Sequence, residues 1–187
     1  MNTATTTLTL NEGFFARRNW RDWLFAALVL AGGLFAFNRY QSAMDIYEQG
    51  ILLAAIPGAI WLGWFWRPLR VLMAAVAGAS LLAIASYQGD LARADQVFWL
   101  KFFLSSQSAI LWMSVLFFMS TVFYWIGMFA RGESGTLERL GSGVAWAAVG
   151  MALVGTMVRW YESYLLGADI GHIPVSNLYE VFVLFCW

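Results

Sequence analysis

A series of apolar stretches, each long enough to cross the roughly 30 Å hydrocarbon core of a bilayer, most constrains the fold of this chain. The chain has 187 residues, of which 61% are hydrophobic and only 12% are charged. Soluble domains carry about a quarter charged residues. In lipid, every backbone polar group needs an internal hydrogen bond, so such stretches fold as helices. We therefore predict an all-α polytopic membrane protein.

Five complete transmembrane helices and the start of a sixth are predicted. The five are expected at residues 23–37, 51–66, 69–86, 108–130 and 142–158, and the sixth begins near Asn177. Basic residues precede the first stretch, as in a signal peptide, but no small-residue cleavage pattern closes it, so we expect an uncleaved signal-anchor. The chain thus divides into an N-terminal tail, 1–22, and a transmembrane helical domain, 23–187.

The loop charges predict the orientation of these helices. With the N-terminus inside, the inner segments hold seven basic residues and the outer segments hold four, in agreement with the positive-inside rule. The inner residues are Arg17, Arg18, Arg21, Arg67, Arg70, Arg131 and Arg139, and the outer ones are Arg39, Arg93, Lys101 and Arg159. The tail 1–22 is therefore expected in the cytoplasm, and the loop 167–177 on the outer face.

Residues 88–107 begin as a polar segment and become strongly apolar around Lys101. Joined to the stretch 108–130, they are too long for one crossing, and the run Ser105-Ser106-Gln107-Ser108 offers a break. We expect an interfacial helix on the outer face, with Trp99 and Lys101 at the depth of the lipid headgroups. The alternative is a simple extension of the helix 108–130 out of the bilayer.

Few side chains in the chain are suited to metal or redox chemistry. His172 is the only histidine and Cys186 the only cysteine, which excludes an internal disulfide and most metal clusters. His172 either hydrogen-bonds a ligand or ties its own loop to a neighbouring carbonyl. Two acidic residues, Glu162 and Asp169, are interpreted as acids of the outer loop, and we expect both to be solvated.

Tryptophan and tyrosine gather near the ends of the predicted helices. We interpret them mainly as an aromatic belt at the membrane surface, although an aromatic surface of this kind can also stack on a flat macrocycle. The set comprises Trp20, Trp23, Tyr40, Trp64, Trp66, Tyr87, Trp99, Trp160, Tyr161 and Tyr164.

The last seventeen residues form a polar loop that leads into an unfinished apolar helix. Asn177 and Glu180 have the spacing of a capping box, which we favour over a functional intramembrane carboxylate at Glu180. The apolar run is too short to cross a bilayer, so we expect a longer parent protein to complete it. The motif reads Gly171-His172-x-Pro174-x-Ser176-Asn177-Leu178-Tyr179-Glu180, and the chain ends in Phe185-Cys186-Trp187.

This tail closely resembles a segment of the CcsA family of cytochrome c biogenesis proteins, called CcsB or ResC in some bacteria, in the system II haem-handling superfamily. The stretch 98–112, FWLKFFLSSQSAILW, also resembles the proteobacterial branch of that family. The candidate site residues of the tail motif are His172, Pro174, Ser176, Asn177, Tyr179 and Glu180.

The resemblance implies a multi-pass protein of the bacterial inner membrane that handles haem and supports its covalent attachment to apocytochrome c. It further implies a ResB-type membrane partner (also called CcsB) and a thiol-reducing, thioredoxin-like protein, and no nucleic acid. The family's tryptophan-rich loop, ending in Trp-x-Trp-Asp, does not occur in this chain, and its axial histidines lie downstream of the tail motif. We therefore assign no catalytic residue, metal ligand or haem ligand, and we expect this N-terminal part to be inactive alone. The alternative is a non-catalytic membrane anchor or transporter fragment.

Overall fold

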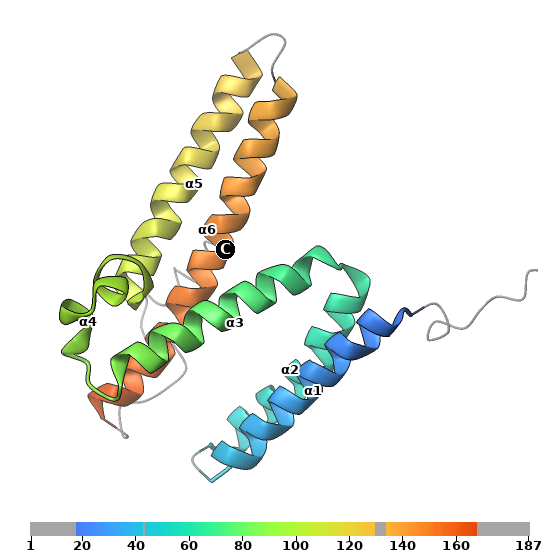
Figure 1. Ribbon diagram of the computed structural model, residues 1–187, viewed down its shortest axis with the longest axis vertical. Coiled ribbons are helices and arrows are strands. Elements are labelled where there is room, and N and C mark those ends of the chain that lie inside the picture. Colours follow the sequence, from blue (N-terminus) through green and yellow to red (C-terminus); the bar gives the residue numbers. More distant parts are fainter. Residues whose placement is uncertain (1–17, 43, 130–133, 168–187) are drawn as a thin grey trace, which may run out of the picture. The chain divides into compact units, whose positions relative to one another are not determined.

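A computed structural model describes residues 18–42, 44–129 and 134–167, and every regular element in these ranges is a helix. In chain order they are α1 (Trp20–Tyr40), α2 (Ile46–Phe65), α3 (Pro68–Tyr87), α4 (Arg93–Gln96), the π-helical turn η1 (Leu100–Leu104), α5 (Ser106–Phe129) and α6 (Ser134–Leu166) (Figure 1). All of these except α4 and η1 are long and apolar enough to cross a membrane. The prediction of an all-α polytopic membrane protein is confirmed. The expected sixth helix lies outside the described residues.

Most of the helix boundaries extend beyond the apolar windows that predicted them. The largest difference is α6, which has 33 residues where the sequence predicted 142–158. Apolar windows end at the first charges, whereas a helix continues until its backbone is capped or broken. The first helix likewise begins early, because the Asn19 side chain accepts the backbone N–H of Trp20 and forms a capping box with Asp22.

The chain forms two compact units, Met1–Val71 and Leu72–Trp187. In the first, α1 and α2 run side by side as an antiparallel hairpin, blue and teal in Figure 1. Two glycines allow their close approach. A Cβ atom on Gly63 would lie 2.3 Å from the ring of Phe25, and one on Gly33 would lie 2.4 Å from the side chain of Ile56. Small residues at such contacts are how membrane helices pack without a strong hydrophobic driving force.

Asp22 ties the start of α1 to the turn between α2 and α3. Its carboxylate is only 1% exposed and accepts the backbone N–H of Asn19 at 2.9 Å and Nη2 of Arg70 at 2.5 Å. Nη2 of Arg67 lies 3.4 Å from the same carboxylate. The Trp64 indole also donates to the carbonyl oxygen of Asp22, at 2.9 Å. A buried charge is tolerated because donors surround it.

A tight turn around Arg67 joins α2 to α3, where only residues 67 and 68 separate the predicted helices 51–66 and 69–86. Trp66 has extended backbone angles, and Pro68 is the first residue of α3. Proline suits that position because its missing N–H would have no helical partner there. The turn therefore brings Arg67 and Arg70 to the same end of the hairpin as Asp22.

In the second unit, α5 and α6 form a longer antiparallel hairpin, yellow and orange in Figure 1. A Cβ on Gly155 of α6 would lie 3.3 Å from the Cβ of Ala109, so the two helices approach closely there. At the other end of the pair, Ser120 Oγ donates to the carbonyl of Gly141 at 2.8 Å. The buried core joins residues of α3, η1 and α6, and comprises Ala83, Tyr87, Leu100, Leu104, Val154 and Val158.

The segment 88–107 differs from both of its predicted forms. It contains the short helix α4 and the turn η1, and Ser105 is extended before α5 begins at Ser106. The predicted break is confirmed, and the alternative of a simple extension of the helix 108–130 is wrong. Leu100 and Leu104 are buried in the core, so the segment is packed on one side rather than lying as a free amphipathic helix. Its depth in a membrane stays a prediction.

Candidate functional site

The six candidate residues of the tail motif, His172, Pro174, Ser176, Asn177, Tyr179 and Glu180, lie outside the described residues. Asp169 does too. What the structure brings together instead is a buried polar cluster around Glu162, to which α3, α5 and α6 each contribute one side chain. We define the Glu162 cluster as Glu162, Tyr87 and Ser106.

The carboxylate of Glu162 accepts three hydrogen bonds inside the protein. The Tyr87 hydroxyl donates to Oε1 at 2.5 Å, and the backbone N–H of Ser106 donates to the same oxygen at 3.0 Å. The Ser106 hydroxyl donates to Oε2 at 2.5 Å. Nη1 of Arg159, one helical turn away, lies 4.0 Å from Oε2. Hydrogen bonds to a charged acceptor in a low-dielectric interior are short and strong.

The expectation that Glu162 is a solvated loop acid is wrong, because the residue is only 7% exposed. The cause is the length of α6, which places Glu162 inside the helix instead of after it. Val154, Val158 and Glu162 follow at intervals of four and therefore share one face. Both valines are buried, so their face carries Glu162 into the core. Continuing this i, i+4 pattern past the charged Arg159 would have found it in the sequence.

Tyr87 is fully buried, although its position at a helix end predicted a place in the aromatic belt. It is the last residue of α3, and the chain turns away through Gln88 and Gly89, both with positive φ. Its ring lies 5.9 Å from that of Tyr161, so an aromatic pair flanks the hydrogen bond to Glu162. By contrast, Trp20, Trp23, Tyr40, Trp66, Trp99 and Tyr164 are at least 40% exposed, as belt residues would be.

The third member of the cluster, Ser106, begins α5. The first N–H groups of a helix have no partner within it, and a carboxylate there also meets the positive end of the helix dipole. Glu162 of α6 supplies this partner for the Ser106 N–H. Ser105 Oγ accepts the N–H of Ser108 at 3.3 Å, so a second N–H group in the first turn of α5 also has a side-chain acceptor. The start of α5 is thus held by a residue 56 positions away in the chain.

Side chains from α5 also hold the π-helical turn η1. The Trp112 indole donates to the carbonyl of Phe102 at 2.8 Å, and Ser108 Oγ donates to that of Lys101 at 2.6 Å. The rings of Phe103 and Trp112 are stacked, with centroids 5.6 Å apart. The stretch 98–112 therefore forms one fixed local arrangement. Three large aromatic side chains, Phe98, Trp99 and Phe102, remain at least half exposed on it.

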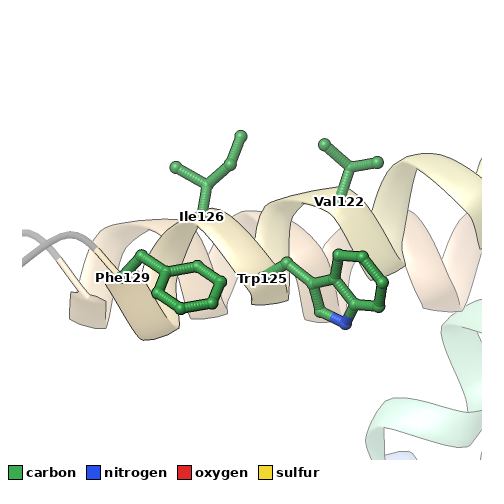
Figure 2. A pocket seen from close by; sticks show the side chains of 4 residues that line it. All are labelled: Val122, Trp125, Ile126 and Phe129. Atoms are coloured by element: carbon green, nitrogen blue, oxygen red, sulfur yellow. The ribbon is translucent and has the colours of Figure 1, made fainter.

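A shallow apolar surface lies near the C-terminal end of α5. It is lined by Val122, Trp125, Ile126 and Phe129. Figure 2 shows these side chains projecting from successive turns of the helix. All four are apolar, and three of them are 48% exposed or more. In a membrane-spanning helix such a face is suited to contact with acyl chains, because its side chains carry no polar group apart from the indole N–H of Trp125.

The described residues lack two of the usual haem ligands. They contain no histidine and no cysteine, so they present neither an imidazole nor a thiolate to an iron atom. Within the same ranges, no group of three or more His, Cys, Asp or Glu side chains is arranged to hold a metal ion. The Glu162 cluster, with its carboxylate oxygens occupied by internal donors, is built to hold helices together.

Together, these helices define a multi-pass, all-α membrane protein whose second unit is held by a buried carboxylate. No protein-family model, no curated protein and no solved structure matches the chain.

Replacing Glu162 should destabilise the second unit far more than replacing an exposed acid of the same helix. For Glu162→Ala we expect a loss of about 3 kcal/mol in the free energy of unfolding, since Tyr87 and Ser106 keep buried donors without an acceptor. The matched control is Glu138→Ala, at an exposed position of α6, with a change within about 0.5 kcal/mol. Thermal unfolding in detergent micelles measures both. Equal effects would show that the carboxylate does not hold the unit.

Proposed function

We propose that this chain is a membrane component of cytochrome c assembly, which handles haem and supports its covalent attachment to apocytochrome c. The observation that carries the proposal is the resemblance of the tail 171–187 to the CcsA family, joined by that of the stretch 98–112. A ResB-type membrane protein and a thiol-reducing, thioredoxin-like protein are the partners that this proposal implies.

In this proposal the described residues have a supporting role. The stretch 98–112 is one of the two segments that resemble the CcsA family. Its fixed local arrangement supports a role in positioning its aromatic side chains. Glu162 holds the start of α5, and Trp112 and Ser108 hold η1. Haem ligation is assigned to none of these residues. They would fix the aromatic side chains Phe98 and Trp99 relative to α5 and α6.

A non-catalytic membrane anchor or transporter subunit is the second candidate function. The observation in its favour is that the buried carboxylate of Glu162 is satisfied by internal donors, as in a structural cluster. Within this candidate the observation favours the anchor over the transporter subunit, because a transport site would present polar groups to a cavity. The two candidates differ in one consequence, because only the first predicts that c-type cytochromes depend on the gene.

The proposed location is the bacterial inner membrane, with the N-terminus in the cytoplasm. The charge bias of seven inner against four outer basic residues supports it. Reporter fusions after Ser42 and after Asp90 should then be active as alkaline phosphatase outside the membrane. A fusion after Arg139 should instead be fluorescent as green fluorescent protein inside. Activity of all three fusions on one side would contradict the orientation.

Deleting the gene from its host should abolish covalently bound haem in c-type cytochromes and leave b-type haem unchanged. Haem staining of denatured membrane proteins measures the first, and pyridine haemochrome spectra of the same membranes measure the second. The intact gene should restore the stained bands. Normal c-type cytochromes in the deletion strain would refute the assembly function and favour the anchor or transporter subunit.

A further inference from the structure

The charged residues of the first unit are divided between the two ends of the α1–α2 hairpin. In the described residues up to Val71, one end holds four arginines and one acid, Asp22, for a net charge of +3. These arginines are Arg18, Arg21, Arg67 and Arg70. The other end holds Arg39, Asp45 and Glu48, for a net charge of −1. We call the first of these the arginine end.

Asp22 does not neutralise the exposed arginines of this end, because its carboxylate is buried and paired with groups inside the hairpin. It is 1% exposed, and its oxygens accept from Asn19 and from Arg70. Arg70 is also largely buried, and its Nε donates to the carbonyl of Gly63 at 2.7 Å. One acid and one arginine thus form the internal pair. The remaining positive charge lies toward the surface.

Two arginines of this end are exposed. The side chain of Arg67 is 67% exposed, and its contact with Asp22, at 3.4 Å, is long for a charged hydrogen bond. Arg21 is exposed, with its guanidinium 5.6 Å from the centre of the Trp20 ring. Arg21 directly precedes Asp22 in α1, and Arg67 reaches Asp22 from the turn. Arg18, which donates to the carbonyl of Trp64 at 2.7 Å, adds fixed positive charge beside them.

Exposed tryptophans surround the arginine end, as expected for charges at the depth of lipid headgroups. Trp20, Trp23 and Trp66 are 64%, 48% and 41% exposed, and they stand next to the arginines in the chain. Exposed tryptophans at the end of an apolar helix mark the membrane–water interface. The anion present at high concentration at this depth is the phosphate of a phospholipid. A guanidinium binds phosphate through two parallel hydrogen bonds, which gives geometric fit as well as charge.

We propose that the arginine end of the hairpin is a binding site for the phosphate headgroup of an anionic phospholipid. Arg67 and Arg21 contact the phosphate, and Arg18 and Arg70 add positive charge close to it. The exposed tryptophans contact the glycerol and upper acyl region of the same lipid. The site is independent of the proposed role in cytochrome c assembly, because it uses only the first unit.

The test is a titration of the purified full chain, in a neutral detergent, with phosphatidylglycerol, followed by native mass spectrometry. Each arginine near a membrane surface contributes a factor of about five in affinity for anionic lipid. Arg67→Gln should therefore weaken binding about fivefold, and the double change Arg67→Gln with Arg21→Gln about 25-fold. Arg67→Lys, which keeps the charge but loses the two parallel hydrogen bonds of the guanidinium, should weaken binding less than Arg67→Gln does.

The matched control is Arg39→Gln, which removes an arginine from the opposite end of the same hairpin. It should leave the affinity for phosphatidylglycerol unchanged. Equal weakening by Arg39→Gln and Arg67→Gln would overturn the proposal, as would equal affinity for phosphatidylcholine. Inorganic phosphate at the same concentration should not displace the lipid. Displacement by free phosphate would show a general anion site and would contradict a lipid site.

Discussion

The buried carboxylate of Glu162 is the interaction on which the second unit depends. A charge in an apolar interior is tolerated only when donors surround it, and here Tyr87 and Ser106 supply them from two other helices. The same contacts fix where α3 ends and where α5 begins. Through α5, whose side chains bind the carbonyls of η1, they also fix the aromatic segment that precedes it.

In both units a buried carboxylate accepts a backbone N–H group at the start of a helix. Asp22 accepts the backbone N–H of Asn19, the N-cap residue of its own helix, and binds an arginine of the turn that follows α2. Glu162 binds the first N–H of a helix that begins 56 residues earlier. Apolar helices in lipid gain little from hydrophobic contact with each other, so close glycine contacts and buried hydrogen bonds carry the specificity. A buried acid that binds a helix start therefore caps that helix and also joins it to another part of the chain.

The sequence predicted what depends on local pattern and missed what depends on distant contacts. The five apolar windows predicted the five long helices and the short connection before α3, and the serine run predicted the break before α5. The ends of α6 were missed because charges at helix termini resemble loop residues. The burial of Glu162 and Tyr87 was missed because each depends on a partner 75 residues away. The tail motif, which carries the resemblance, lies outside the described residues.

The coupling energy between Tyr87 and Glu162, from a double-mutant cycle of Tyr87→Phe and Glu162→Ala, tests most directly whether the buried carboxylate holds the second unit. Unfolding of the parent chain, both single variants and the double variant gives the interaction free energy of the pair, separate from general effects of each change. We expect a coupling of about 1–3 kcal/mol, as for residues in one buried hydrogen-bond network. Additive effects, with a coupling below about 0.5 kcal/mol, would show that the carboxylate does not hold α3 against α6.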